Sequence, residues 1–354
     1  MKNIADSHIH IRFCNYESIS KMLGDISETG VTEACILPLP YRGACENLAA
    51  LYTKMNYKKI NVRAFGGLHV TDRYCTVSPE IMAEKLLDAG CDGIKLMFSP
   101  DLERYYGKGL NDRSYDKMFS MLEERGAPVN IHLADPENFW DDGGKYNTGG
   151  FPSKDQMYSE AFEMLDRHPG LKVTFAHFMF LSNFHDEAVR VLEKYPNVWL
   201  DITPGVEMYI NFDKSWDLWH NFFTKYSDRI LFGTDSNTIK TCNVQLENLV
   251  YKKLTEKDIF TQNCYGRDFV VKGLALSEDV VRKICYDNYF RRLGKDAAKV
   301  DTDKFYDYCE RVLFDIENGQ YDEHYIKGGE LIPDLKKDPT QSITTQFCKF
   351  ALSK

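Results

Sequence analysis

Short β-rich runs alternate with longer helical patterns along most of the chain, and this alternation restricts the fold more than any other feature. The runs are Ile4–His10, Glu33–Leu39, Arg63–Val70, Gly93–Phe98, Val129–Ala134, Val173–Phe178, Val198–Thr203 and Ile230–Asp235. Strands separated by helices are typical of βα units and a parallel sheet. Because there are eight units in sequence, we predict an α/β fold of the (β/α)8 TIM-barrel type.

A doubly wound open sheet has the same alternation of strands and helices and is the alternative fold. No Gly-x-Gly-x-x-Gly pattern follows the first run, which argues against it. A length of 354 residues suits one large α/β domain or two smaller ones. We predict a barrel domain over residues 1–294. Residues 295–354, which include the helical pattern Asp303–Glu317, are expected to form a helical C-terminal extension packed on the barrel.

The composition excludes several classes of function. A net charge of −9 argues against a nucleic-acid or anionic-membrane surface, and no apolar stretch approaches the length of a bilayer span. The ten cysteines contain no Cys-x-x-Cys pattern, and the N-terminal residues have no signal-peptide layout. We therefore expect reduced thiols, a cytoplasmic location and a small molecule as the main partner.

The first run ends in Asp6-Ser7-His8-Ile9-His10. Residues two apart in a strand point the same way, so His8 and His10 would converge on one side. Two neutral imidazoles in that arrangement can bind one divalent metal ion. Taken alone, the same pattern also fits two polar residues on a half-exposed strand.

Three later runs also carry a candidate ligand near their C-terminal ends, namely His132, His177 and Asp235. Four of the nine histidines therefore lie at strand ends, which favours one shared site. The set of N and O donors suits zinc or another borderline divalent ion. Individually, His177 could be a core imidazole bonded to a carbonyl, and Asp235 could be a helix N-cap.

These motifs together resemble the amidohydrolase superfamily, in its amidohydrolase-related branch of metal-dependent hydrolases similar to aminocarboxymuconate-semialdehyde decarboxylase. The resemblance rests on Asp6-Ser-His8-Ile-His10, Asn130-Ile-His132, Ala176-His177 and Gly233-Thr234-Asp235. It covers about residues 3–290. The segment Tyr286-Asp287-Asn288-Tyr289-Phe290 loosely resembles the family's ending.

The resemblance implies a role for each site residue. His8, His10 and His132 would be metal ligands, and Asp235 would complete the shell while orienting a metal-activated water or accepting its proton. His177 would act beside the metal as a general acid and base. One divalent metal ion is implied, with zinc as the expected metal.

Lys95 lies in the fourth run, where other members of the superfamily carry a lysine that adds CO2 and bridges two metals. A second metal with a carbamylated Lys95 is therefore one interpretation. The others are an ammonium group that binds a substrate carboxylate, and a structural lysine. An unpaired buried lysine would be costly, so Lys95 needs a partner.

Loops after the runs supply further substrate-binding candidates, namely Arg12, Arg42, Glu137 and Trp140. The two arginines could hold a carboxylate. We predict an amidohydrolase-like enzyme that hydrolyses an amide, ester or lactone of a small organic substrate. The alternative is a non-oxidative decarboxylase or hydratase acting on an unsaturated or aromatic carboxylic acid. A non-catalytic scaffold would have no reason to keep all five site residues. A homodimer is one expected assembly, because barrel enzymes of this type are often dimers.

Overall fold

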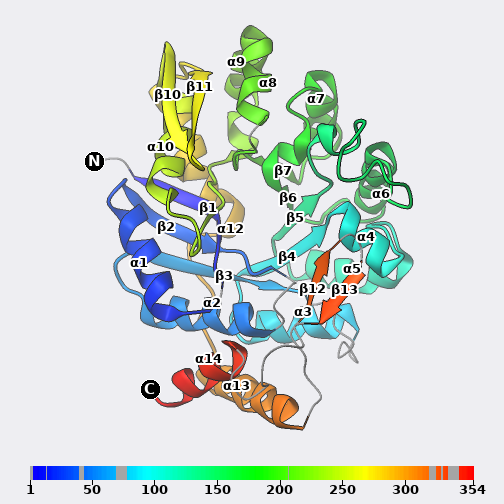
Figure 1. Ribbon diagram of the computed structural model, residues 1–354, viewed down its shortest axis with the longest axis vertical. Helices are drawn as coiled ribbons and strands as arrows, with labels where there is room; N and C mark the ends of the chain where they lie inside the picture. The colour runs from blue at the N-terminus through cyan, green and yellow to red at the C-terminus, as the bar shows by residue number, and fades with distance from the viewer. Residues whose placement is uncertain are drawn as a thin grey trace.

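Nine parallel strands form one curled sheet at the centre of the computed structural model (Figure 1). The structure describes residues 3–12, 14–39, 44–68, 78–205, 207–318, 324–327, 330–333 and 343–354. The strands are β1 (Ile4–His10), β2 (Val31–Ile36), β3 (Asn61–Gly67), β4 (Gly93–Phe98), β5 (Val129–Leu133), β6 (Val173–Phe175), β7 (Val198–Asp201), β8 (Ile230–Leu231) and β9 (Ser236–Asn237). They follow the order of the chain around the sheet, which confirms the predicted TIM-barrel fold.

The last two strands are parts of one segment, and this segment closes the barrel. β8 pairs with β7, and β9 pairs with β1. Between them, Ser7 N donates to Phe232 O at 2.9 Å, and Asp235 N donates to His8 O at 2.9 Å. The prediction of one continuous strand over Ile230–Asp235 was wrong, because the backbone turns at Asp235 with a φ of 58°. This turn places the side chain of Asp235 at the mouth.

The helices cover the outside of the sheet. They are α1 (Tyr16–Ser27), α2 (Ala44–Asn56), α3 (Pro79–Asp88), α4 (Pro100–Tyr106), α5 (Asp116–Glu124), α6 (Lys154–Arg167), α7 (His185–Lys194), α8 (Met208–Lys214), α9 (Trp216–Lys225), α10 (Asn243–Thr255), α11 (Glu278–Arg282) and α12 (Asn288–Leu293). α6 begins where the side chain of Ser153 accepts a hydrogen bond from Gln156 N at 3.1 Å. Within the described ranges, no helix is both long and apolar enough to cross a membrane.

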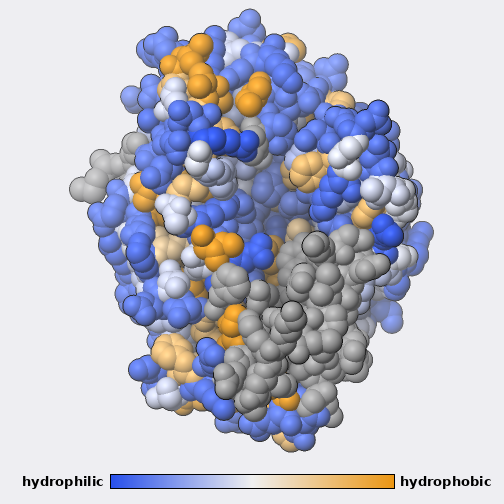
Figure 2. Space-filling model, in the orientation of Figure 1, coloured by the Kyte–Doolittle hydropathy of each residue, from blue (hydrophilic) through white to orange (hydrophobic). Residues whose placement is uncertain are grey.

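A two-stranded hairpin follows α10 and was not predicted. It consists of β10 (Ile259–Cys264) and β11 (Arg267–Lys272), and Figure 1 shows it projecting from the barrel. A lone hairpin is marginally stable in water. Here Cys264, Phe269 and Val271 are buried, whereas apolar side chains remain exposed on the hairpin surface (Figure 2). The hairpin is therefore held by its buried residues.

The predicted helical segment after the barrel is present. α13 (Thr302–Glu317) and α14 (Ile343–Leu352) pack on each other and on α2. The ring of Tyr52 on α2 contacts Phe305, Phe347 and Phe350. A short strand pair, β12 (His324–Lys327) with β13 (Glu330–Pro333), comes between these helices in the sequence, contacts α4 and was not predicted.

Three polar side chains form hydrogen bonds that stabilise the end of the barrel where the strands begin. The Arg63 guanidinium donates to the carbonyls of residues 293–296 at 2.6–3.1 Å. Arg292 donates from Nε to Thr174 Oγ1 at 2.8 Å, and Asn288 donates to the carbonyls of residues 227 and 230 at 2.6 and 2.7 Å. The three donating side chains are buried, so these bonds satisfy polar groups that would otherwise lack a partner.

Two carboxyl groups, those of Glu103 on α4 and Glu160 on α6, are buried and interact with each other. Burial and then the charge of Glu160 raise the pKa of Glu103 from 4.5 to about 8. The folded chain therefore keeps a proton that the unfolded chain releases, and its stability falls as the pH rises between these values. We expect Glu103→Gln to raise the Tm by about 2–4 °C at about pH 8.5, and to change it little at about pH 5.

Thermal unfolding at the two pH values measures this effect. The matched control is Glu163→Gln, which changes an exposed glutamate on the same helix as Glu160. An equal Tm shift at both pH values would contradict the assignment of the pH-dependent proton to Glu103.

Candidate metal centre

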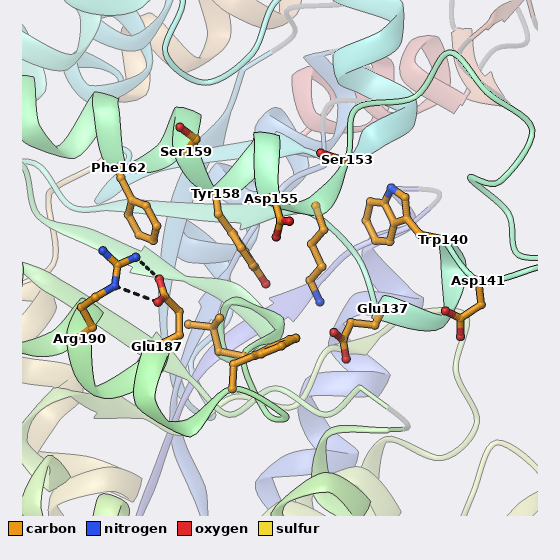
Figure 3. A pocket seen from close by; sticks show the side chains of 13 residues that line it. Glu137, Trp140, Asp141, Ser153, Asp155, Tyr158, Ser159, Phe162, Glu187 and Arg190 are labelled. Carbon is orange, nitrogen blue, oxygen red and sulfur yellow. Dashed lines mark hydrogen bonds and ion pairs between the residues drawn. The ribbon is translucent and has the colours of Figure 1, made fainter.

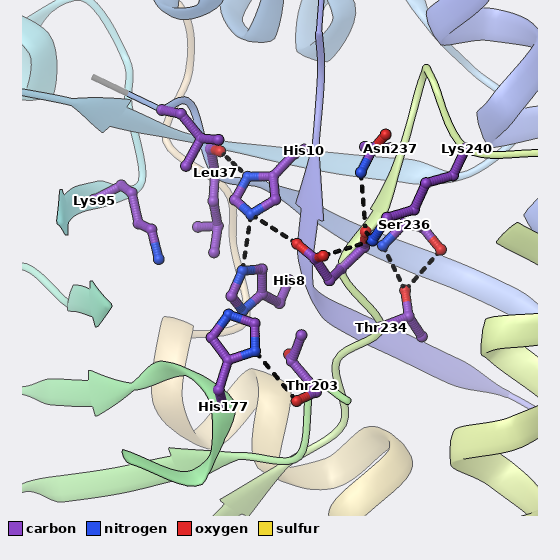
Figure 4. A network of polar contacts seen from close by, with 12 residues as sticks. His8, His10, Leu37, Lys95, His177, Thr203, Thr234, Ser236, Asn237 and Lys240 are labelled. Atoms are coloured by element: carbon purple, nitrogen blue, oxygen red, sulfur yellow. Dashed lines mark hydrogen bonds and ion pairs between the residues drawn. The ribbon is translucent and has the colours of Figure 1, made fainter. Parts of the chain in front are cut away.

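His8 and His10 converge at the end of β1, as the strand period predicts (Figure 4). Their Nε2 atoms lie 3.0 Å apart, and His10 Nε2 lies 3.1 Å from Asp235 Oδ1. The ligand atoms of the three residues all lie within 4.8 Å of one another. These residues are therefore the candidate ligands for a single metal ion.

The other ring nitrogens of the two histidines are occupied. His8 Nδ1 donates to Asp201 Oδ2 at 2.9 Å, and His10 Nδ1 donates to Leu37 O at 2.5 Å. Burial lowers the pKa of His8, and it lowers the pKa of His10 to about 3. Both rings are therefore neutral, with their Nε2 lone pairs facing each other, and a cation between them removes that repulsion. Neutral imidazoles fixed through Nδ1 are the usual nitrogen ligands of a divalent metal.

Asp235 supplies the oxygen of the set. Burial would raise the pKa of its carboxyl group, but Lys240 and His10 together hold that pKa well below its usual value. Lys240 Nζ donates to Asp235 Oδ2 at 2.5 Å and to Asp235 O at 2.6 Å. The ammonium group therefore fixes the carboxylate so that Oδ1 points to His10. Lys240 lies in a loop five residues beyond Asp235, and no sequence pattern indicated it.

His132 and His177 extend the group of imidazoles. The His177 ring lies 5.3 Å from the His8 ring and 5.0 Å from the His132 ring, measured between centroids. His132 Nε2 is buried and has no hydrogen bond from any described residue, although it lies 3.5 Å from Asp135 Oδ1. His132 is not within the 4.8 Å set, so its role as a ligand stays a prediction. Its unpaired nitrogen is compatible with that role.

His177 lies on a left-handed turn. The prediction that the strand continues to Phe178 was wrong, because β6 ends at Phe175. His177, Phe178, Met179 and Phe180 all have φ between 51° and 56°. This conformation costs an L-residue roughly 1–2 kcal/mol, and it persists only where the surroundings impose it. The turn brings His177 beside His8. A strand that continued to Phe178 would not place His177 there.

Asp201, at the end of β7, connects the two halves of the site and was missed in the sequence. Its Oδ2 accepts from His8, and its Oδ1 accepts from His177 N at 2.9 Å and from Thr203 N at 3.2 Å. Burial would raise the pKa of Asp201, but its contacts with His8 and His177 lower that pKa overall. The signal was present, since Asp201 is an acidic residue near the end of a predicted strand, as Asp235 is.

We expect Asp201→Asn to weaken metal binding about 10–100-fold, the usual effect of removing a carboxylate behind a ligand histidine. The amide can no longer accept as a charged group, so the orientation of the His8 ring loosens. Competition with a chromogenic chelator measures the affinity. The control is Asp258→Asn, at an exposed aspartate before β10. Unchanged affinity in the Asp201 variant would show that His8 is oriented by other contacts.

Lys95 is buried close to this group (Figure 4). Its Nζ donates to Asn130 Oδ1 at 2.5 Å. Burial lowers the pKa of Lys95 to about 8, while the charges of Asp201 and Asp235 act in the opposite direction. Within the described residues, the ammonium group has a neutral amide as its hydrogen-bond partner and no carboxylate in contact.

The other predicted substrate contacts are more scattered. The backbone of Arg12 pairs with the Thr238 hydroxyl, and Arg12 Nε is buried with no hydrogen bond to the part of the chain that the structure describes. Arg42 lies outside the described residues. Glu137 and Trp140 line a cavity of about 650 Å³ beside α6 and α7 (Figure 3). Trp140 Nε1 donates to Pro152 O at 3.0 Å, so this indole anchors its loop.

Comparison with known proteins supplies independent information on this fold. The family model described as amidohydrolase matches residues 22–289, a range that includes His132, His177 and Asp235. A search of curated proteins gave no match.

Solved structures with the same fold include three informative examples. An uncharacterised TIM-barrel protein from Bordetella bronchiseptica has a TM-score of 0.54 at 15% identity, covering 82% of this chain and 98% of its own. The 4-oxalomesaconate hydratase of Rhodopseudomonas palustris has a TM-score of 0.51 at 14% identity, covering 88% of each chain. The 2,6-dihydroxybenzoate decarboxylase of Rhizobium has a TM-score of 0.51 at 13% identity, covering 83% of this chain and 99% of its own. The matched family model spans most of the barrel, and the chain belongs to the amidohydrolase family.

Proposed function

We propose that this chain is a metal-dependent lyase that acts on a small unsaturated or aromatic carboxylic acid, by releasing CO2 or by adding water. The observation that carries the proposal is the Lys95 ammonium, which is buried beside the candidate ligands and, among the residues that the structure describes, has only an amide as hydrogen-bond partner. A buried charge of this kind is stabilised by an opposite charge. A substrate carboxylate supplies that charge.

His8, His10 and Asp235 would hold the metal, with His132 as a further ligand. Their donor set fits a divalent ion, because the facing Nε2 atoms lack a proton between them. We propose zinc as the resident ion. When bound, such an ion polarises a substrate oxygen and lowers the pKa of water.

His177 is the proposed acid and base. Its Nδ1 donates to Thr203 O at 3.3 Å, which leaves Nε2 with a free lone pair. Burial, and then the charges of His132 and His8, hold the pKa of His177 well below its usual value. The ring is therefore neutral, and Nε2 can take a proton from a hydroxyl group or water and return it to the substrate carbon.

The solved structures with this fold support the choice of reaction, since they include a hydratase and a decarboxylase. Hydrolysis of an amide, ester or lactone is the second candidate. It is favoured by the neutral His177 and the Asp235 carboxylate, which interact electrostatically, because either group could also accept the proton of an attacking water.

A substrate screen decides between them. Protein loaded separately with Zn²⁺ and Mn²⁺ is given aromatic and unsaturated carboxylic acids, lactones and N-acyl compounds. We expect CO2 release or hydration with an acid. Turnover confined to lactones or N-acyl compounds would overturn the lyase proposal in favour of hydrolysis.

The role of Lys95 is tested on the best acid from that screen. Lys95→Met removes the charge and should raise KM at least about tenfold, because a buried charged hydrogen bond to a carboxylate is among the strong ones. An unchanged KM would contradict the binding of a substrate carboxylate by Lys95, and with it the main argument for the proposal. Two metals per chain, with the mass of a carbamate on Lys95, would instead establish the bridged binuclear site.

A further inference from the structure

The left-handed turn that carries His177 is built from four residues with side chains, although glycine adopts such a conformation far more readily. Its beginning is held by Asp201, which accepts the backbone N–H of His177 at 2.9 Å. The Phe178 ring is buried against the rings of Phe212, Trp219, Phe222 and Phe223. These contacts do not involve the carbonyl groups at the end of the turn.

Two side chains of α6 bind those carbonyl groups. The Tyr158 hydroxyl donates to Met179 O at 2.8 Å and approaches Phe180 O at 3.4 Å. Lys154 Nζ donates to Phe180 O at 3.2 Å. Residues four apart lie on the same face of a helix, so both side chains reach the turn from one side of α6. Tyr158 extends from α6 in Figure 3, and its side chain is buried.

The end of the turn also sets the position of the His177 ring. The Phe180 ring stacks on the His177 ring with a centroid separation of 5.3 Å and an angle of 23° between the planes. The Phe180 ring also contacts the His132 ring, with a centroid separation of 5.5 Å. A displacement of Phe180 therefore moves the surface against which His177 rests.

We propose that Tyr158, assisted by Lys154, is a positioning residue that holds the left-handed turn and so aims His177 Nε2 into the site. The catalytic part of this inference rests on the proposed function of His177. The Tyr158 hydroxyl donates to backbone carbonyl groups of the turn. Its effect on a reaction would therefore pass through His177.

The first test needs no substrate. Metal-loaded protein is treated with diethyl pyrocarbonate, and the carbethoxylation rate of the peptide that contains His177 is followed by mass spectrometry. Loss of one buried hydrogen bond in Tyr158→Phe should raise the population of the opened turn, and with it the rate at His177, by about 3–10-fold. The peptide that contains His220 should react at an unchanged rate.

The matched control is Tyr195→Phe, which removes a hydroxyl group bonded to Asp166 at 2.9 Å and not to the turn. The control should leave the rate at His177 unchanged. A rate in Tyr158→Phe equal to that of the wild type would overturn the proposal, as would the same rise in the control.

The second test is a double-mutant cycle measured on the best acid of the screen. Tyr158→Phe should lower kcat about tenfold with KM and metal content unchanged, and it should have no further effect in the His177→Asn background. An equal loss in both backgrounds would overturn the positioning role. Full turnover in His177→Asn alone would instead overturn the proposed function of His177, whereas the labelling test of the turn would keep its meaning.

Discussion

Replacing His8 by alanine is expected to remove the metal ion and, with it, all measurable turnover. His8 is one of three residues whose ligand atoms cluster within 4.8 Å. The substitution leaves only His10 and Asp235 in that set, and it leaves the Asp201 carboxylate without its histidine partner. We expect the affinity to fall by more than about 100-fold, beyond the usual loss when a supporting residue behind a ligand is removed.

Elemental analysis after dialysis against a weak chelator measures the outcome. The control is His220→Ala, because His220 bonds to Leu274 O and stacks on Trp216, away from the cluster. Full metal retention in the His8 variant, at unchanged affinity, would contradict the assignment of the centre. His8→Gln separates ligand loss from the loss of packing, since it keeps most of the side-chain volume.

Replacing His177 by asparagine should lower turnover without loss of the metal ion. We expect the metal to stay bound and kcat to fall at least about 100-fold, the lower end of general acid–base contributions. The reason is that His177 Nε2 is free for proton transfer, whereas Nδ1 is used in a bond to Thr203 O. Asparagine tolerates the left-handed conformation of this position, so the turn should form.

Kinetics on the best acid of the screen and elemental analysis together decide this prediction. His185→Asn serves as the control, because His185 lies on the outer helix α7. Near-full turnover of the His177 variant would transfer the acid–base role to Asp235. Loss of metal from that variant would identify His177 as a ligand and favour a binuclear centre.

The parts of the site that sequence reasoning named are those that follow from the strand period and from positions near strand ends. His8 and His10 are two apart in one strand, and such residues point the same way whatever surrounds them. The order of the eight βα units likewise needs only local hydrophobic patterns. This information sufficed for the barrel, for His8 and His10, and, through its place near the end of a predicted strand, for Asp235, so all three clustered candidate ligands were named.

The parts that were missed depend on contacts between distant segments. The turn at His177 contains no glycine that would indicate it in the sequence. Its contacts are with Asp201 and with side chains of α6, both distant in the chain. The bond between Lys240 and Asp235 depends on how a loop folds back, which no periodicity records. For the same reason, the hairpin β10–β11 and the strand pair β12–β13 were not predicted.

The hydrogen bonds at one end of the barrel affect how the sequence of this protein can change in evolution. Arg63, Arg292 and Asn288 bind backbone carbonyl groups where the strands begin, and the candidate site lies where the strands end. Mutations in the loops at the mouth therefore leave these anchors intact. Proteins with this arrangement can change their substrate through mutations in the loops, while the hydrogen bonds that stabilise the barrel at its other end stay the same.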